Sequence, residues 1–467
     1  MNPAKSVQHA IVIGGSVTGL LATRVLSQYF AQVTLIERDP LSDRPESRKG
    51  QSHTRHLHAL LATGKAVLDR YFPDLIESLH AGGAVLADMA QAPRWHIFGG
   101  YRIQYESGLI GILMSRPFLE SQIRDRVRRL PNVTVLDGTT VEDLVATPDR
   151  SQITGVRIQR AAGGGSYETL NADWVVDASG RGSASPRWLE TLGYAKPPET
   201  KVTVGVGYAT RLYRRQPNDL PHAQVAIVAA DPPHCQHAGM VFPIEGDRWI
   251  ATLVSWGGEQ PPLDEQGFLA FAQNLSAPDV YQILSRAEPL SEIVGYKFPA
   301  SLRRHYEKLA RFPGGYLIMG DALCSFDPAY GQGMTSAALQ ATALDDLLQM
   351  QPDLQKLAPR FFKKVAKIVD IPWQLAVGED FRFPETQGKK AFGTDWLNAY
   401  VALVHRATHT DPIVYGALLK VMNLMESPTR LLHPAIVWRV LRANVQAKVL
   451  SKNDEFSNLR WFPIPKA

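Results

Sequence analysis

The sequence predicts an α/β fold that combines a βαβ unit, a second β-sheet and a C-terminal helical region. Residues 10–13 and 33–36 are short apolar runs separated by a glycine-rich turn and a segment with helical spacing, as in a βαβ unit. The segments 201–212 and 224–256 are rich in apolar and β-branched residues, and they predict strands of a separate sheet. From residue 355 onward the apolar spacing is mostly helical.

The expected elements follow in chain order, with a polar loop at 39–56. The predicted helices are 20–30, 57–71, 117–129, 264–288 and 334–350, and Pro117 stands in the first turn of the third. The other predicted strands are short pieces within 84–115, then 133–136, 141–147, 153–160, 167–170, 174–177 and 316–319. We expect 153–160 and 167–170 to form a hairpin with its tip at glycines 163–165.

The composition is that of an ordinary globular protein. The chain has 467 residues and a mass of 51.6 kDa, which corresponds to roughly three domains at about 150 residues each. Hydrophobic residues make up 45% and charged residues 20%, which excludes disordered, collagen-like and coiled-coil proteins. Only two cysteines are present, Cys235 and Cys324, so a disulfide framework and a cysteine-rich metal cluster are both excluded.

The charge balance is weakly basic and is concentrated near the C-terminus. The net charge of +5 is too small to indicate a nucleic-acid partner. Residues 401–467 hold nine Lys or Arg and four Asp or Glu, so this segment alone carries the whole excess. It could contact a carrier protein, an anionic substrate or a membrane surface, or it could be a solvated helical face. We see neither a signal peptide nor a transmembrane run, and we expect a cytoplasmic protein.

The first candidate site is the glycine-rich turn after residue 13. It contains Gly14, Gly15, Ser16, Thr18 and Gly19, with Ser16 at the place of the middle glycine of G-x-G-x-x-G. Such a turn lets a pyrophosphate approach the backbone at a helix N-terminus. Glu37, at the end of the next strand, can bind ribose hydroxyls. The motif predicts a dinucleotide site; the alternative is an α/β turn without a nucleotide.

Two further motifs follow predicted strands. Asp321 comes directly after the strand at 316–319, and a loop opening the next helix contains Pro328, Gly331, Gly333 and Met334. The carboxylate can hold a sugar or ribityl hydroxyl, and the helix N-terminus can face an anionic group. The third motif, Asp-Ala-Ser-Gly-Arg at 177–181, is either a cofactor-binding strand end or a capped turn.

In order and spacing, the three motifs resemble those of single-component (group A) FAD-dependent monooxygenases of the p-hydroxybenzoate hydroxylase fold. The resemblance covers roughly residues 8–350. Within that group, Arg48–Gln51 with His53, His56 and His58, and the run GDALCSFDPAYGQGM, are similar to flavin epoxidases of polyether biosynthesis of the lasalocid and monensin type. The run at 372–388 extends this similarity.

The resemblance implies a Rossmann-like FAD-binding domain of the p-hydroxybenzoate hydroxylase and glutathione reductase type, interleaved with a β-sheet substrate domain. The FAD-binding parts would be 1–83, 111–190 and 299–350, and the substrate parts 84–110 and 191–298. The C-terminal helical region would be 351–467.

The resemblance also implies roles for individual residues. Gly14, Gly15 and Gly19 would bind the pyrophosphate, Glu37 the adenosine ribose, and Arg38 would lie beside the adenine. Asp321 would bind the ribityl or pyrophosphate region, and Arg116 and Gln51 would reach the cofactor from neighbouring loops. The full predicted FAD-binding set is Gly14, Gly15, Ser16, Thr18, Gly19, Glu37, Arg38, Gln51, Arg116, Asp321, Pro328, Gly331, Gly333 and Met334. No metal is expected, although the spacing of His53, His56 and His58 is compatible with a metal site.

The implied activity is oxygen transfer from a flavin C4a-hydroperoxide, formed with NAD(P)H and O₂, to an alkene of a lipophilic polyene, polyketide or terpenoid. No second strand-linked G-x-G-x-x-G appears, so NAD(P)H would bind without a domain of its own. The W-x-W motif of flavin halogenases is absent from the sequence, which disfavours a halogenase. The G-x-S-x-G motif of hydrolases is absent as well. The alternatives are an aromatic hydroxylase, a reductase or dehydrogenase of the geranylgeranyl-reductase kind, and a non-catalytic FAD-binding or prenyl-carrier protein. Candidate substrate-lining residues are Phe242, Trp249, Trp256 and Trp373, each of which is otherwise a core residue.

Overall fold

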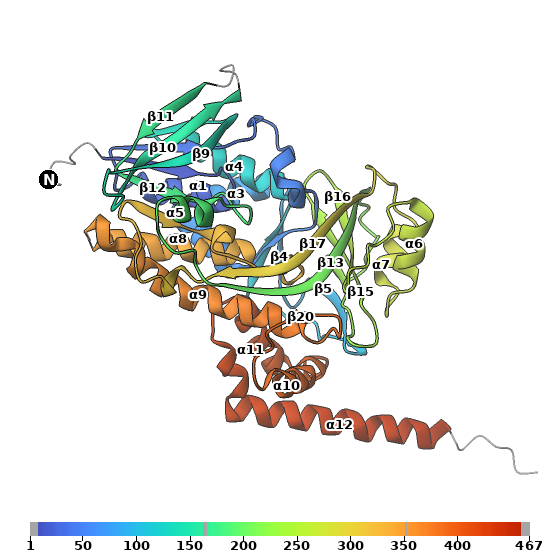
Figure 1. Cartoon of the computed structure of the whole chain (residues 1–467). Coiled ribbons are helices and arrows are strands. Elements are labelled where there is room, and N and C mark those ends of the chain that lie inside the picture. Colours follow the sequence, from blue (N-terminus) through green and yellow to red (C-terminus); the bar gives the residue numbers. More distant parts are fainter. Residues whose placement is uncertain (1–7, 162–165, 351–352, 459–467) are drawn as a thin grey trace, which may run out of the picture.

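The computed structural model describes residues 8–161, 166–350 and 353–458 (Figure 1). The expected hairpin is present, because β10 (Ile153–Arg160) pairs antiparallel with β11 (Tyr167–Asn171). Its expected tip at glycines 163–165 lies outside the described residues.

A five-stranded parallel sheet forms the centre of the N-terminal half, in the order β18-β12-β1-β2-β8. Its strands are β1 (His9–Ile13), β2 (Gln32–Ile36), β8 (Val133–Leu136), β12 (Trp174–Asp177) and β18 (Tyr316–Ile318). The central strands are almost entirely apolar because both faces of a parallel sheet are covered. All five strands end at the same edge, and each predicted motif begins at this edge.

Helices and a small sheet cover this parallel sheet. Helices α1 (Val17–Leu26), α8 (Gly333–Gln349) and α9 (Leu357–Asp380) pack in succession. The other helices of this half are α2 (Ala62–Tyr71), α3 (Leu75–Ala81), α4 (Arg116–Arg128) and α5 (Ser185–Thr191). An antiparallel sheet of β9 (Thr139–Ala146), β10 and β11 packs through β10 against β12.

Two predictions in this half were wrong in detail. The helix expected over 57–71 begins only at Ala62, because residues 59–60 instead form β3 (Ala59–Leu60). Strand β3 pairs with β7 (Ile110–Leu113), which also pairs with β4 (Val85–Asp88). The expected loop at 39–56 contains a 3₁₀ helix at Lys49–Arg55. This turn places Gln51 beside the ends of the parallel strands.

The second half of the fold is a nine-stranded mixed sheet in the order β19-β17-β13-β16-β15-β14-β5-β6, with β20 also paired to β13. The strands are β5 (Pro93–Ile97), β6 (Gly100–Tyr101), β13 (Glu199–Arg214), β14 (Val225–Val228), β15 (His237–Ile244), β16 (Arg248–Ser255), β17 (Val294–Arg304), β19 (Cys324–Ser325) and β20 (Gln387–Gly388). Helices α6 (Glu265–Gln273) and α7 (Asp279–Leu284) cover one face of it. The other face is available to line a cavity.

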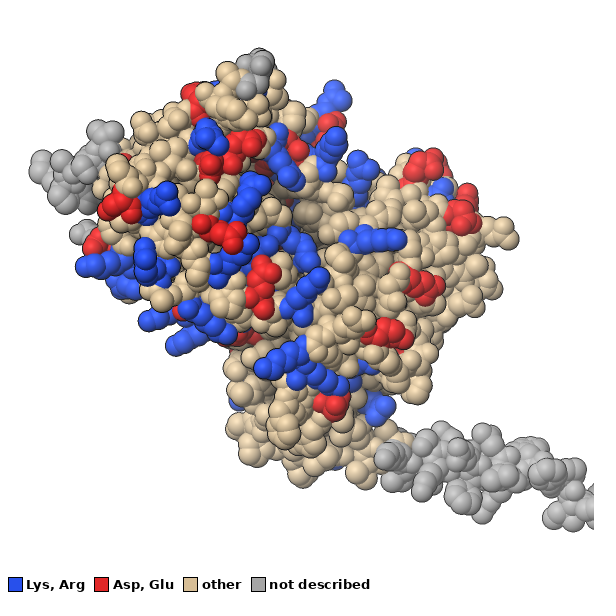
Figure 2. Space-filling view, in the orientation of Figure 1, with Lys and Arg blue, Asp and Glu red and all other residues tan. Residues whose placement is uncertain are grey.

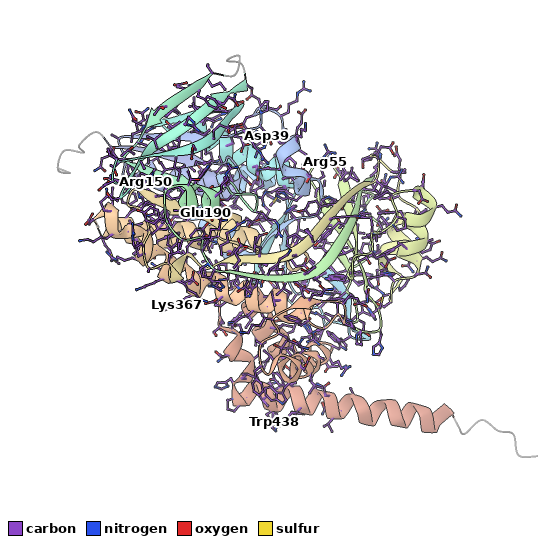
Figure 3. All side chains as sticks on the ribbon, in the orientation of Figure 1. Asp39, Arg55, Arg150, Glu190, Lys367 and Trp438 are labelled. Carbon is purple, nitrogen blue, oxygen red and sulfur yellow. The ribbon has the colours of Figure 1, made fainter. Side chains whose placement is uncertain are left out.

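The C-terminal region is helical, as predicted. Helices α10 (Thr394–Ala407), α11 (Pro412–Met422) and α12 (Pro434–Asn458) share a small apolar core, and the end of α12 projects from the body (Figure 1). Figure 2 shows mainly uncharged side chains over this bundle, and Trp438, labelled in Figure 3, is 58% exposed. In the described part of the chain, no helix is long and apolar enough to cross a membrane.

Much of the basic charge of the C-terminal region is compensated locally. Lys420 and Arg430 both pair with Glu426, and Arg439 pairs with Asp411. Arg460 and Lys466 lie outside the described residues. Contact between this region and a membrane or a carrier protein therefore stays a prediction.

Candidate functional site

A cavity of about 850 Å³ connects the strand ends of the parallel sheet with the nine-stranded sheet and the C-terminal helices. Of the predicted cofactor-binding residues, the following line it: Gly14, Gly15, Ser16, Thr18, Glu37, Arg38, Gln51, Arg116, Asp321, Pro328, Gly331, Gly333 and Met334. The sequence motifs therefore converge on one site, although they come from segments far apart in the chain. Their individual contacts with a cofactor stay predictions.

Gly19 is the exception, and its role is in packing. A Cβ atom at Gly19 would lie 1.7 Å from the carbonyl oxygen of Gly14, so only glycine lets helix α1 cross the turn this closely. Gly14 itself has a φ of +103°. Thr18 links two motifs, because a Cβ at Gly320 would meet the Thr18 hydroxyl at 2.6 Å. The turn thus brings the N-terminus of α1 up to the cavity.

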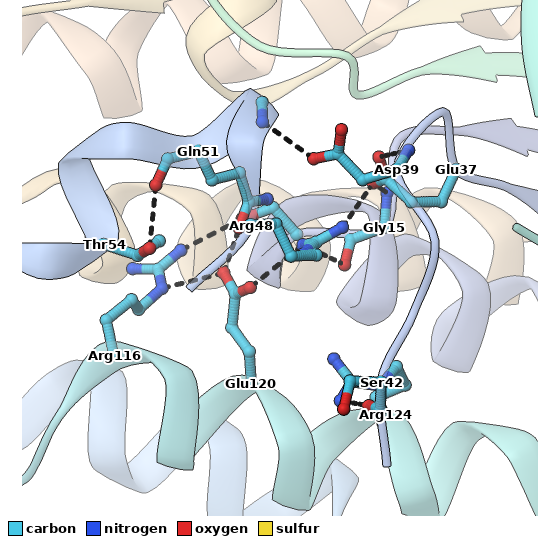
Figure 4. A network of polar contacts seen from close by, with 12 residues as sticks. Gly15, Glu37, Asp39, Ser42, Arg48, Gln51, Thr54, Arg116, Glu120 and Arg124 are labelled. Atoms are coloured by element: carbon cyan, nitrogen blue, oxygen red, sulfur yellow. Dashed lines mark hydrogen bonds and ion pairs between the residues drawn. The ribbon is translucent and has the colours of Figure 1, made fainter. Parts of the chain in front are cut away.

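A buried network of charges supports this turn (Figure 4). Arg48 pairs with Glu37 at 2.9 Å and with Glu120 at 3.1 Å. Glu120 also accepts from Arg116 at 2.8 Å and from the Ser16 hydroxyl at 2.7 Å. Burial alone would raise the pKa of Glu120, but the guanidinium groups of Arg116 and Arg48 lower it to about 2. The two carboxylates and two guanidinium groups hold one another in place beside the strand ends.

Glu37 lies at the end of β2 and lines the cavity. Its carboxylate accepts the backbone N–H groups of Gly15 at 2.7 Å and of Asp39 at 3.0 Å. These bonds, with the Arg48 ion pair, fix the orientation of the carboxylate. Arg38 donates to the Gly50 carbonyl at 3.2 Å, so the segment before Gln51 is tied to the same end of the cavity.

The third motif divides into a capped turn and a lining segment. Asp177 is fully buried, and it accepts hydrogen bonds from the Ser179 backbone N–H at 2.9 Å and from the hydroxyls of Ser183 and Ser185. This confirms the capped-turn interpretation for Asp177. Residues 178–182 line the cavity, and Arg181 is held there by Ser325 at 3.3 Å.

Asp321 and the two glycines at the start of α8 leave room for a flat, polar group. Among the described residues Asp321 has no hydrogen bond or ion pair, although it lines the cavity. A Cβ atom at Gly331 or at Gly333 would have no atom of the protein within 4 Å. A free carboxylate and an open glycine surface at a helix N-terminus fit the ribityl chain and ring of a flavin.

The three histidines of the segment after Gln51, namely His53, His56 and His58, form part of the cavity wall. His56 bonds Thr210 at 2.7 Å, and its ring lies against those of Tyr208 and Tyr296. Burial lowers the pKa of His53 and of His56 to about 4 and that of His58 to about 3, so all three are neutral at pH 7. No three metal-ligating side chains in the described segments are grouped as a metal site.

A pair of buried carboxyl groups lies behind the glycine loop. Asp327 accepts from Tyr208 at 3.0 Å and from Trp256 at 3.2 Å, and Asp380 accepts from Tyr330 at 3.1 Å. Burial raises the pKa of both carboxyl groups, and the charge of Asp327 raises that of Asp380 further, which favours a proton on Asp380. Asp380 lies within the run 372–388, but the resemblance of that run to flavin epoxidases implied no role for it.

The far side of the cavity is mainly apolar. Phe242 and Trp256 line it as predicted, whereas Trp249 and Trp373 do not and are core residues. Further lining residues come from the C-terminal helices and the turn after α11, among them Leu375, Leu397, Val401, Leu418, Met422 and Leu431. Gln332, in the glycine loop, donates to the carbonyl of Met422 at 2.9 Å. The C-terminal region thus closes the cavity and is attached to the loop beside the cofactor site.

Comparison with known protein families agrees with this architecture. Residues 7–351 match the model described as "FAD binding domain". The chain belongs to this FAD-binding family. The fold expected from the sequence is confirmed.

Individual relatives show how far the similarity extends. The chain is 32% identical to "Protein Rv3254" of Mycobacterium tuberculosis over 94% of each chain. It is 25% identical to a 6-methylpretetramide 4-monooxygenase of Streptomyces rimosus, over 76% of this chain and 78% of the relative. A solved flavoprotein/dehydrogenase of Cytophaga hutchinsonii has the same fold, with a TM-score of 0.65 and 16% sequence identity. The match covers 96% of this chain and all of that one.

Proposed function

We propose that this FAD-binding protein is a monooxygenase that uses NAD(P)H and O₂ to epoxidise an alkene of a lipophilic polyene, polyketide or terpenoid. The observation that carries the proposal is the continuous cavity, which joins the FAD-binding motifs to a mainly apolar chamber. Bound FAD supplies the redox chemistry and the activation of O₂. The chain supplies orientation and a site from which water is excluded.

Each group of residues has a distinct part in this proposal. Gly14 and Gly15 would hold the pyrophosphate, Glu37 the adenosine ribose, and Asp321 the ribityl chain. The apolar walls around Phe242 and Trp256 would bind the substrate next to the flavin ring. An alkene needs no ionisation before it accepts oxygen, and the neutral His56 beside the cavity is suited to a site without a strong base.

Two other activities are compatible with the same fold. Aromatic hydroxylation is supported by the named monooxygenase from Streptomyces rimosus, and the solved flavoprotein/dehydrogenase supports hydrogenation or dehydrogenation. An aromatic hydroxylase inserts one oxygen atom into a C–H bond, whereas a reductase or dehydrogenase inserts none. Incorporation of an oxygen atom therefore separates the two oxygenases from the reductase or dehydrogenase, and its position in the product separates an epoxide from a hydroxylated ring.

The deciding experiment is turnover under ¹⁸O₂. The FAD-loaded protein would be incubated with NADPH or NADH and a panel of polyenes and phenols, and the products analysed by mass spectrometry. We expect one ¹⁸O atom per product, a mass gain of one oxygen with no loss of hydrogen, and ring opening of the product by acid as for an epoxide. A hydroxylated ring would favour the aromatic hydroxylase. A product that gains or loses hydrogen without ¹⁸O, also under anaerobic conditions, would overturn the monooxygenase proposal.

A further inference from the structure

Arg102 is a buried cation on the cavity wall without a carboxylate partner. Only 4% of the residue is exposed, and it is one of the cavity-lining residues. Its Nη2 atom donates to Nδ1 of His405 at 2.9 Å, while its Nε and Nη1 atoms have no hydrogen-bond partner. No ion pair joins it to any carboxylate of the described residues. Glu379 interacts with Arg102 electrostatically but forms its ion pair with Arg382, at 2.7 Å.

The side chains that Arg102 contacts directly are neutral. The guanidinium carbon lies 3.7 Å from the ring centre of Trp95 and 5.1 Å from that of Tyr415. His405 is uncharged, because burial and the neighbouring Arg102 hold its pKa well below the usual range. Its ring stacks on Phe98 at 5.1 Å. Aromatic faces attract a cation, but they compensate a buried charge less completely than an anion does.

The other arginines that line the cavity lie beside the predicted FAD-binding motifs. Arg116 pairs with Glu120 in the network beneath the glycine turn. Arg38 and Arg181 lie next to predicted FAD-binding motifs. Arg102 instead lies on the side of the C-terminal helices, where the cavity is lined by Ile97, Phe98, Leu418, Leu419 and Met422. A single uncompensated cation in an apolar chamber indicates where the acidic end of an otherwise apolar ligand would bind.

We propose that Arg102 binds a carboxylate of the substrate, so that the substrate is an amphipathic acid with an apolar chain. The inference rests on the proposed function only in placing the substrate in this cavity. A carboxylate would supply the missing countercharge and accept hydrogen bonds from the guanidinium group. His405 would act as a positioning residue that orients Arg102. The apolar chain would then extend from Trp95 and Phe98 along the chamber toward the flavin.

The test is a binding measurement that needs no turnover. The FAD-loaded protein would be titrated calorimetrically at pH 7 with octanoate and with octanamide, which has the same chain but no charge. We expect the carboxylate to bind at least tenfold more tightly than the amide. Arg102→Gln should remove this preference and Arg102→Lys should keep part of it. The control is Arg215→Gln, which removes an arginine 5.0 Å from the ring of Trp249, a residue that does not line the cavity.

The outcomes are separable from those of the ¹⁸O₂ experiment. Equal affinities for octanoate and octanamide in the native protein would overturn the inference, even if Arg102→Gln failed to fold. A carboxylate preference that survives in a folded Arg102→Gln variant with full FAD content would overturn it as well. A preference that depends on Arg102 would support it, whether or not the product contains ¹⁸O.

Discussion

Asp380, the last residue of α9, has a pKa that is raised by burial and by the charge of Asp327, the residue before the turn Pro328–Tyr330. Both side chains are fully buried. The hydroxyl of Tyr330 donates to Asp380 at 3.1 Å, and this bond joins the C-terminal region to the glycine loop. Two predictions about charge follow from buried groups of this kind, and two concern the cavity wall.

Asp380→Asn should become more stable, relative to the native protein, as the pH rises. The folded protein holds a proton that the unfolded chain releases above about pH 4. The native free energy of unfolding therefore falls as the pH increases from about 4 toward the raised pKa of the pair, by at most about 1.4 kcal/mol per pH unit. Asparagine does not titrate, so the variant lacks this pH dependence. Urea unfolding at pH 5 and pH 8 would measure the difference.

The control for this prediction is Asp346→Asn, because Asp346 forms a half-exposed ion pair with Lys364. The free energy of unfolding of this variant, relative to the native protein, should show no comparable increase at high pH. A difference between Asp380→Asn and the native protein that does not change with pH would contradict a raised pKa for Asp380.

Glu120→Gln should destabilise the protein by about 3 kcal/mol at pH 7. The pKa of Glu120 is lowered to about 2 in the folded state, so its contribution is complete above about pH 4.5 and is lost as the pH falls toward 2. The variant would also leave the guanidinium groups of Arg48 and Arg116 without part of their countercharge. Urea unfolding would measure the loss. Glu190→Gln, which breaks an exposed pair with Lys196, should cost well under 1 kcal/mol.

Gly333→Ala should weaken FAD binding at least tenfold without destabilising the apoprotein. The added methyl group meets no protein atom and would project into the space predicted for the flavin. In the first turn of α8, alanine should leave the apoprotein unfolding free energy unchanged or raise it by up to about 1 kcal/mol. Titration of the apoprotein with FAD, followed by fluorescence, would measure the affinity, and an unchanged value would show that FAD does not approach this glycine.

His56→Gln should reduce the loss of stability at acid pH. The native His56 has a pKa of about 4 because it is buried, whereas in the unfolded chain its pKa is about 6.5. Protonation therefore favours unfolding as the pH falls from about 6.5 toward 4, by at most about 1.4 kcal/mol per pH unit. Thermal melts of the variant and the native protein at pH 7.5 and 5 would test this. His433→Gln, at an exposed position, should melt in parallel with the native protein.

The cofactor end of the site was predictable because its residues follow strands. Glu37, Asp321 and the glycine turn each come after a short apolar run, and parallel strands bring their carboxyl ends to one edge. Gly19 fits the same sequence pattern but does not line the cavity, and the absence of a side chain there lets α1 pack closely on Gly14. Asp177 shows that a carboxylate at a strand end can instead accept the hydrogen bonds that cap a turn.

The apolar end of the cavity was not predictable, since its residues come together only through tertiary packing. Arg102 and His405 are 303 positions apart, and no local pattern relates them. The partner of Asp327 lies at the end of a different helix, where Asp380 resembles any polar residue near a helix terminus. Likewise, an apolar run that includes Trp249 or Trp373 does not reveal whether a side chain faces a cavity or the core.

The family match ends at residue 351, yet residues from 374 to 431 complete the wall of the chamber. The part of the site within residues 7–351 and the part formed by residues 374–431 can therefore change in sequence independently of each other. Substitutions in α9, α10, α11 and the turn after α11 can change which molecule the chamber admits, while the FAD-binding motifs stay intact. In searching for the natural substrate, the sequence after residue 351 is therefore the better guide, because relatives that agree there should share a substrate and not merely a flavin.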